Sequence, residues 1–196
     1  MKESAQKERQ AEERIVRGAC AALTGRSGEP LRYAMMSDTP VGLLGIAVAP
    51  TGLVRIDFSR DEDRFLLDVL GRFDDRPVLR DPLDRERRAL DRYFAGDRLT
   101  FEDLRFDLSA LPPFEQRVLQ ATAAIPPGRV ATYAQVAGKA GNPRASRAAG
   151  NALNHNPVAI VVPCHRVVRS DGSLGGYGGG LPRKEWLLRH EGATPA

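Results

Sequence analysis

Residues 160–177 read IVVPCHRVVRSDGSLGGY, and we take this stretch as the centre around which the chain folds. Three β-branched residues, 160–162, stop at Pro163, which is typical of a strand that ends at a breaker. Cys164 and His165 follow at once, so a thiol and an imidazole would stand at the end of a buried strand. Adjacent side chains of a strand point to opposite faces, so His165 would reach the sulfur only through a bridging water.

A cysteine that follows an apolar run has two interpretations. Most such cysteines are small buried hydrophobic residues, and a thiol without positive charge around it is inert. Here Arg166 and Arg169 add positive charge close to Cys164, which favours a thiolate. A nucleophilic site is therefore one hypothesis for this stretch, and a structural cysteine is the other.

Composition places the chain among ordinary globular proteins. Its 196 residues are 42% hydrophobic and 28% charged, enough for one good core or two small ones. No stretch approaches a membrane span, and the charged N-terminal sequence MKESAQKERQAEER does not resemble a signal peptide, so we expect a cytoplasmic protein. Cys20 and Cys164 are too few for a disulfide framework.

The net charge of +4 is distributed unevenly along the chain. Residues 113–196 carry ten Arg or Lys against four Asp or Glu, whereas residues 1–112 carry nineteen against twenty-one. The basic half is the half that holds the cysteine motif. A solvated surface could have the same imbalance, but a polyanionic partner for the C-terminal half is the sharper hypothesis.

The first hundred residues predict a small α/β unit. Residues 1–30 form an arm of unknown role with a short helix at 15–23, and residues 31–100 form the unit itself. VGLLGIAVA and VRIDF alternate as strands across Pro50-Thr51-Gly52, which predicts a hairpin. Apolar residues at helical spacing predict amphipathic helices at 61–73 and 83–94. We assign this unit no chemistry of its own.

The second half predicts a mainly helical unit at 113–196, after a linker at 101–112. A helix follows Pro113, and Thr132 with Gln135 makes a capping box for a second one that ends near Gly141. Asn142 can cap a third helix, with Pro143 in its first turn, that runs to about Asn154. Two helices joined by a tight turn indicate a helix-turn-helix.

The second helix of this pair has two distinct faces. Arg144, Arg147, Asn151 and Asn154 form a polar stripe, while Ala145, Ala149 and Ala152 form the opposite one. A polar stripe is often only a solvated surface, but together with the basic charge it favours DNA contact. Farther on, a glycine-rich loop surrounds Tyr177, and a last helix at 181–190 is followed by Glu191.

Three segments in this order resemble one known family. PCHRVV, the GGYGGG loop and KEWLLRHEG are similar to those of the O6-alkylguanine-DNA alkyltransferases, the methylated-DNA–protein-cysteine methyltransferases. The likeness is dense over residues 113–192 and loose over 33–101. It implies an α/β (α+β) protein with a small ribonuclease-H-like N-terminal domain and a mainly helical C-terminal domain that holds the helix-turn-helix and the active-site cysteine.

The resemblance also implies a reaction. The expected function is DNA repair by direct, irreversible, single-turnover transfer of an alkyl group from O6-alkylguanine, and also from O4-alkylthymine, to Cys164. His165 matches a base that acts through water, Glu191 the carboxylate that orients it, and Asn156 the residue that braces this network. Tyr133 matches the tyrosine that donates to the guanine as it leaves. A thioether cannot be hydrolysed as a thioester can, so each molecule would act once.

For the DNA, the resemblance implies nucleotide flipping into a pocket. Val167, Tyr177 and Gly178 match the walls that bind guanine; many relatives have serine where Gly178 stands, so a backbone N–H would replace its hydroxyl. Arg147 matches the arginine that fills the vacated stack, with Arg144, Asn151 and Tyr133 as further DNA contacts. Binding would be in the minor groove with low sequence specificity. We expect a monomer, and the sequence leaves cooperative binding open.

Two other function classes fit parts of the sequence. A cysteine hydrolase could use Cys164, His165 and Glu191, although an adjacent Cys and His suit it poorly. A non-catalytic, lesion-sensing helix-turn-helix module fits the basic half, with Cys164 as a core residue. We expect no cofactor and no metal, since His155, His165, His190 and Cys20 show no ligand spacing.

Overall fold

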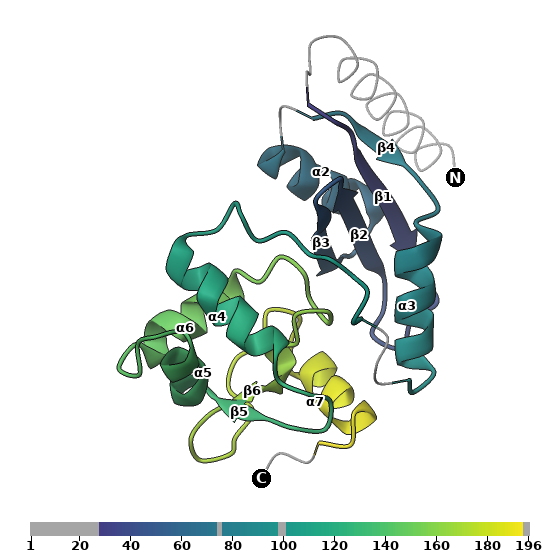
Figure 1. The fold of residues 1–196 in the computed structure, drawn as a ribbon. Helices are drawn as coiled ribbons and strands as arrows, with labels where there is room; N and C mark the ends of the chain where they lie inside the picture. The colour runs from purple at the N-terminus through teal and green to yellow at the C-terminus, as the bar shows by residue number, and fades with distance from the viewer. Residues whose placement is uncertain (1–27, 74–75, 98–100, 194–196) are drawn as a thin grey trace, which may run out of the picture.

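The computed structural model describes residues 28–73, 76–97 and 101–193, which form two packed units (Figure 1). The N-terminal unit is a sheet with two helices, and the C-terminal unit is mainly helical, so the predicted fold class is confirmed. The helix predicted at 15–23, and Cys20 within it, lie outside the described residues. No helix of the described part of the chain is long and apolar enough to cross a membrane.

The N-terminal sheet has four strands in the order β3-β2-β1-β4. They are β1 (Leu31–Met36), β2 (Leu44–Ala49), β3 (Gly52–Phe58) and β4 (Val78–Arg80). The antiparallel hairpin of β2 and β3 is confirmed, while β1 and the short parallel β4 were not predicted. Every residue of β2 is buried, because this central strand is covered on both faces.

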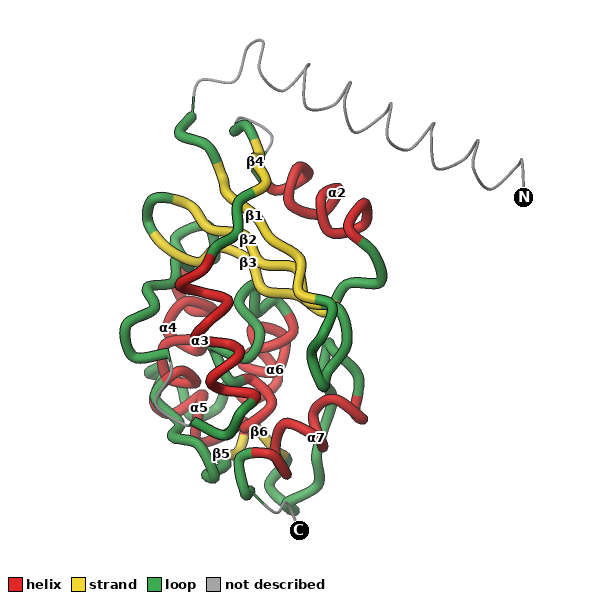
Figure 2. The backbone as a smooth tube through the Cα atoms, turned by 90° about the vertical axis from the view of Figure 1, so that its right-hand side faces the viewer, coloured by secondary structure: helices red, strands yellow, loops and turns green. Residues whose placement is uncertain are grey.

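The two faces of the sheet belong to two different cores. Figure 2 shows the helix α2 (Glu62–Arg72) on one side of the sheet and the C-terminal unit on the other. On one face, Tyr33 and Val54 pack against Phe65 and Val69 of α2. Side chains of the other face join α3 (Asp84–Phe94) and the C-terminal unit in one larger core. The alternation of strand side chains therefore turns one face of the sheet towards the candidate site.

Backbone pairing closes the outer edge of β3. Leu53 bridges to Phe106 of the link, and Ile56 bridges to Val158, the latter through Ile56 N–H donating to the Pro157 carbonyl at 2.8 Å. An open edge strand is available for unwanted pairing, and both bridges cover it. They also attach the sheet directly to the segment that leads to Cys164.

The helices of the C-terminal unit lie close to their predicted positions. They are α4 (Pro113–Ala123), α5 (Tyr133–Lys139), α6 (Ser146–Asn154) and α7 (Leu181–His190). The capping box of Thr132 and Gln135 is formed in full. The start of α6 was predicted wrongly, because Asn142 to Arg144 form a turn in which the Ala145 N–H donates to the Asn142 carbonyl at 3.0 Å.

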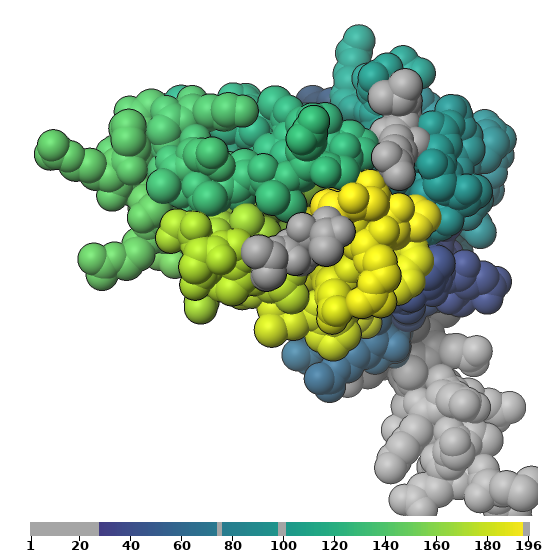
Figure 3. Space-filling view, turned by 90° about the horizontal axis from the view of Figure 1, so that it is seen from below, coloured from purple at the N-terminus to yellow at the C-terminus, as the bar shows by residue number. Residues whose placement is uncertain are grey.

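The strand predicted at 160–162 is also wrong. These residues form a turn, with Ile160 in the left-handed region at φ 72°, and Cys164 begins a single 3-10 turn, η1 (Cys164–Arg166). The short strand β6 (Val167–Val168) follows this turn directly and pairs in parallel with β5 (Ala131–Thr132). In Figure 3, α7 (yellow) lies between the rest of the C-terminal unit and the N-terminal unit.

Candidate functional site

Cys164 is half-buried, and its sulfur accepts hydrogen bonds from the Asn156 side chain and from the backbone N–H groups of Cys164 and His165. Asn156 Nδ2 donates to the sulfur at 3.1 Å and to the Val162 carbonyl at 2.8 Å, while Asn156 Oδ1 accepts from the Val158 N–H at 3.1 Å. One side chain therefore bridges the start and the end of the turn at 158–162. Asn156 therefore contacts both the turn and the thiol.

Behind the cysteine lies a buried cluster around Glu191. Its carboxylate accepts from Tyr93 Oη at 2.7 Å, from His165 Nε2 at 2.9 Å and from Arg166 Nε and Nη2, each at 2.8 Å. The relative exposure of Glu191 is 1% and that of His165 is 0%. Burial alone would raise the pKa of Glu191, but the hydrogen bonds from His165 and Arg166 and the charge of Arg166 hold it well below its usual range.

The imidazole of His165 is oriented by this carboxylate. Since Glu191 only accepts, His165 Nε2 carries the proton, and Nδ1 is left as a buried acceptor without a hydrogen-bond partner among the described residues. Burial lowers the pKa of His165 below its ordinary value, so the ring is neutral near pH 7. Among the described residues, no direct hydrogen bond joins His165 to the thiol of Cys164. This geometry is compatible with a base that acts through a bridging water.

The charges around the thiol differ from those that the sequence predicted. Burial raises the pKa of Cys164, and only part of this is offset by the Asn156 hydrogen bond and the charge of Lys184. Arg166 is not the cation that activates the thiol, because its guanidinium donates hydrogen bonds to Glu191 and to the Ile125 carbonyl. The resting thiol is therefore protonated, and a base must remove its proton during attack.

Lys184 is a site residue that the sequence analysis missed. It is fully buried, and its ammonium donates to the carbonyls of Val167 at 2.6 Å, of Leu174, and of Gly176 at 3.4 Å. Burial lowers the pKa of Lys184 to about 8. A signal was present, because Lys184 shares the apolar face of α7 with Leu187, Leu188 and Glu191. A lysine on such a face indicates a buried amine with partners.

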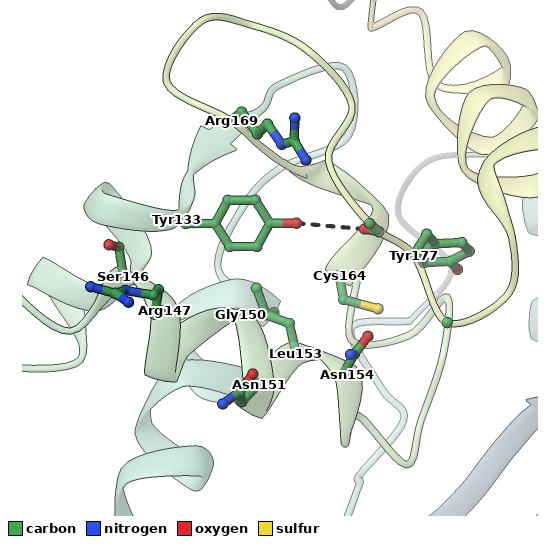
Figure 4. Close-up of a pocket in the computed structure, with 12 residues that line it drawn as sticks. Tyr133, Ser146, Arg147, Gly150, Asn151, Leu153, Asn154, Cys164, Arg169 and Tyr177 are labelled. Atoms are coloured by element: carbon green, nitrogen blue, oxygen red, sulfur yellow. Dashed lines mark hydrogen bonds between the residues drawn. The ribbon is translucent and has the colours of Figure 1, made fainter.

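In front of the cysteine is a cavity of about 390 Å³ (Figure 4). Its walls come from α5, α6, the Cys164 turn and the glycine-rich loop; the lining residues are Tyr133, Ser146, Arg147, Gly150, Asn151, Leu153, Asn154, Cys164, Arg169, Gly176, Tyr177 and Gly178. The sequence had named six of these as site residues, whereas Val167 and Arg144 line neither this cavity nor the one beyond the cysteine. Val167 is fully buried, and Arg144 is exposed in the turn before α6.

Tyr133 ties the helix-turn-helix to the glycine-rich loop. Its hydroxyl lies 3.5 Å from the Gly176 carbonyl, as the dashed line in Figure 4 marks. Gly175 has φ 66°, and a Cβ there would lie 2.8 Å from the Tyr133 hydroxyl oxygen. Glycine is therefore required at this position for the loop to approach the tyrosine.

A second cavity, of about 520 Å³, reaches Cys164 from the side of the N-terminal sheet. Arg55, Asp57 and Phe58 of β3 form part of its wall, and Asn156 and Ala159 form another part. Cys164, Tyr177 and Gly178 line both cavities, together with Leu153 and Asn154. The sulfur therefore stands where the two hollows meet.

The exposed face of α6 agrees with the predicted stripe. Arg147, Asn151 and Asn154 are exposed, whereas Ala149 and Ala152 are fully buried against the core. Arg147 and Asn151 lie beside the mouth of the first cavity, on the same wall as Tyr133 (Figure 4). This arrangement places an exposed cation and an amide next to the opening that leads to the thiol.

Comparison with known proteins covers both units. A family model described as "6-O-methylguanine DNA methyltransferase, DNA binding domain" matches residues 113–193, and one described as "6-O-methylguanine DNA methyltransferase, ribonuclease-like domain" matches residues 31–108. A methylated-DNA–protein-cysteine methyltransferase of Methanosarcina acetivorans is 37% identical over 165 residues, which are 82% of this chain and 99% of that protein.

Two further relatives match a half of the chain and most of the chain, respectively. A methylated-DNA–protein-cysteine methyltransferase of Salmonella typhimurium is 51% identical over 100 residues, and the match spans 58% of that protein's length. The crystal structure of Mycobacterium tuberculosis OGT in complex with DNA is 36% identical, with a TM-score of 0.69, covering 82% of this chain and 92% of that one.

Proposed function

The chain belongs to the methylated-DNA–protein-cysteine methyltransferase family, and we propose that it repairs O6-alkylguanine in DNA by transferring the alkyl group to Cys164. The observation that carries this proposal is the position of the sulfur: it faces a cavity walled by the helix-turn-helix and has a neutral, oriented histidine beside it. DNA is the partner that the helix-turn-helix and the basic C-terminal half are suited to bind.

The transfer is an in-line substitution at a saturated carbon. The sulfur of Cys164 forms a bond to the alkyl carbon as the bond from that carbon to guanine O6 breaks. The thiol proton passes through a water to Nδ1 of His165, whose other nitrogen is held by Glu191. Asn156, which donates to the sulfur at 3.1 Å, stabilises the negative charge that develops there before the new bond is complete.

The leaving guanine also develops negative charge. Tyr133 reaches the first cavity with its hydroxyl, and burial raises its pKa, so it remains a donor that protonates the base as it leaves. Tyr177 and Gly178 form the opposite wall. Val167 lies outside the cavity, and its carbonyl accepts from Lys184 Nζ, which also donates to the Gly176 carbonyl of the glycine-rich loop. Because Gly178 carries no hydroxyl, its N–H takes over recognition of O6.

A stacked base cannot reach this cavity, so the nucleotide must leave the duplex at a cost of about a few kcal/mol. Arg147 is exposed at the cavity mouth and fills the vacated position in the stack, with Asn151 as a groove contact. Arg144, in the turn before α6, contacts the phosphate backbone. Minor-groove binding suits the small residues on this helix and gives low sequence specificity.

The second cavity extends the substrate range. During an in-line attack the substituent on the alkyl carbon points away from the line that joins sulfur and oxygen. The hollow of about 520 Å³ beside Cys164 is the space that such a substituent enters. We therefore expect alkyl groups larger than methyl to be accepted. The family resemblance, and not this cavity, adds O4-alkylthymine as a second expected substrate.

The product is a thioether on Cys164, which has no feasible leaving group, so each molecule acts once. We propose that the protein is a cytoplasmic monomer that needs no cofactor or metal for this step. Binding assays on duplexes of increasing length distinguish independent from cooperative binding of several copies.

Intact-protein and peptide mass spectrometry after incubation with a duplex containing O6-methylguanine tests the proposal. We expect one added CH₂ on the peptide that carries Cys164, saturating at one equivalent. Cys164→Ala should gain no mass and still bind the duplex. Binding without modification of the wild type would indicate a lesion-sensing module instead, and loss of binding in the variant would indicate a structural cysteine.

A further inference from the structure

The hydroxyl of Tyr93 connects the N-terminal unit to the carboxylate that orients His165. Tyr93 lies on α3, is 3% exposed, and donates to Glu191 Oε1 at 2.7 Å across 98 residues of sequence. The oxygen that it contacts is the one that accepts from His165 Nε2. A side chain of the N-terminal unit and the base His165 therefore share one hydrogen-bond acceptor, Glu191 Oε1.

Tyr93 is held firmly enough to define this position. Its backbone carbonyl accepts from His190 Nε2 at 2.7 Å, and its ring packs edge-on against the His190 ring at 5.3 Å. His190 in turn stacks on Trp186 at 4.7 Å. The carbonyl and hydroxyl of one residue thus bind the two consecutive residues His190 and Glu191 at the end of α7.

The hydroxyl of Tyr93 also stays protonated. Burial raises its pKa far above the ordinary tyrosine value, and the charge of Glu191 and the hydrogen bond to it raise it further. A fixed donor on Oε1 limits rotation of the carboxylate and reduces its basicity. Glu191 then accepts a hydrogen bond from His165 Nε2 and still stabilises the imidazolium only moderately. His165 therefore remains neutral and able to act as a base.

We propose that Tyr93 is a positioning residue for alkyl transfer, which acts through Glu191 to keep His165 neutral with its proton on Nε2. This inference rests on the proposed function of Cys164. It assigns the N-terminal unit a part in the chemistry, where the sequence analysis assigned it none.

Tyr93→Phe keeps the ring and removes only the hydroxyl, and Tyr33→Phe is a matched control. Tyr33 is also in the N-terminal unit, is 7% exposed, and donates to Glu62 Oε1 at 2.8 Å, on the sheet face that packs against α2. Both substitutions remove a tyrosine-to-glutamate hydrogen bond. Only the first removes one that reaches His165.

The single-turnover rate of alkyl transfer is measured against pH, with duplex affinity measured in parallel. We expect Tyr93→Phe to slow transfer about tenfold, with unchanged affinity, and to move the acid limb of the pH profile upwards, because a more basic Glu191 raises the pKa of His165. Tyr33→Phe should keep the wild-type rate and profile. Equal rates and profiles for the two variants would overturn the proposal.

A second readout does not depend on the proposed function. Nitrogen-15 NMR of the histidines in the full chain reports which ring nitrogen of His165 carries the proton and the pH at which the ring titrates. We expect Tyr93→Phe to raise that titration and Tyr33→Phe to leave it unchanged. If the wild type transfers no alkyl group, the proposed function fails, and an unaltered His165 titration in Tyr93→Phe would separately reject the role of Tyr93.

Discussion

The two sides of Cys164 are built in opposite ways. In front, α6 presents exposed polar side chains beside an open cavity, and these side chains contribute little to the core. Behind, Glu191 and its partners are buried and mutually hydrogen-bonded. Buried charges are stable only when paired, so the rear cluster is rigid and sensitive to change. The front face can change with little effect on folding.

Glu191→Gln tests this comparison with the largest expected effect. The substitution leaves Arg166 as a buried charge without its anion, so the free energy of unfolding should fall by about 3–5 kcal/mol. Transfer should slow about 100-fold, because a neutral amide replaces the carboxylate that fixes the orientation of His165 and stabilises its positive charge once it has taken the thiol proton. Glu62→Gln, on the partly exposed Tyr33 pair, is the control and should change both quantities little. Urea unfolding and single-turnover kinetics measure the two effects.

The same variant should also change how the free energy of unfolding depends on pH in the acid range. The pKa of Glu191 is held below its ordinary value of 4.5, so its ionised form stabilises the fold above that value, and this stabilisation is lost as pH falls through the lower, folded pKa. Unfolding followed from about pH 6 to pH 3 should therefore show a smaller loss of stability in Glu191→Gln than in the wild type. An equal loss would mean that other carboxylates dominate the acid response.

Arg147→Ala probes the front side with a smaller effect. We expect repair of O6-methylguanine in duplex DNA to fall about tenfold, since nothing then fills the vacated stack, while reaction with the free base is unchanged. Stability should change by less than about 0.5 kcal/mol, because the side chain is exposed. Arg144→Ala is the matched control, which should weaken duplex binding and reduce its salt dependence without a separate loss of repair. Equal losses on duplex and free base would remove the flipping role.

The smallest effect that we predict concerns the pH dependence of the transfer rate of the wild-type protein. Burial raises the pKa of Cys164 above 9.0 and lowers that of His165 below 6.5, so both groups are neutral between these values. If His165 takes the proton during attack, the transfer rate should be flat across this range and fall only at more acidic pH. A rate that rises about tenfold per pH unit near neutrality would instead indicate attack by a preformed thiolate.

Local patterns predicted those parts of the fold that depend on nearby residues. The alternation in VRIDF, the capping box at Thr132 and the amphipathic helix before Gly96 all describe contacts within a few residues, and each prediction is confirmed. The strand at 160–162 failed for a physical reason. Residues 160–162 are all buried between the two units, so each of them must be apolar. Such an apolar run is expected for an extended strand and for a buried turn alike, and hydrophobic periodicity could not distinguish these two structures.

The sequence by itself placed a cysteine and a histidine side by side at Cys164 and His165 and predicted the two helices of the helix-turn-helix, because adjacent residues and short-range periodicity carry that information. Only the tertiary structure decided how the surrounding charges are distributed. Arg166 binds Glu191 instead of the thiol, Lys184 donates to carbonyls of β6 and of the glycine-rich loop, and Tyr93 reaches Glu191 from 98 residues away. Buried charges and hydrogen-bonding groups take whichever partners the packing of the two units brings within reach, and no local pattern encodes those partners.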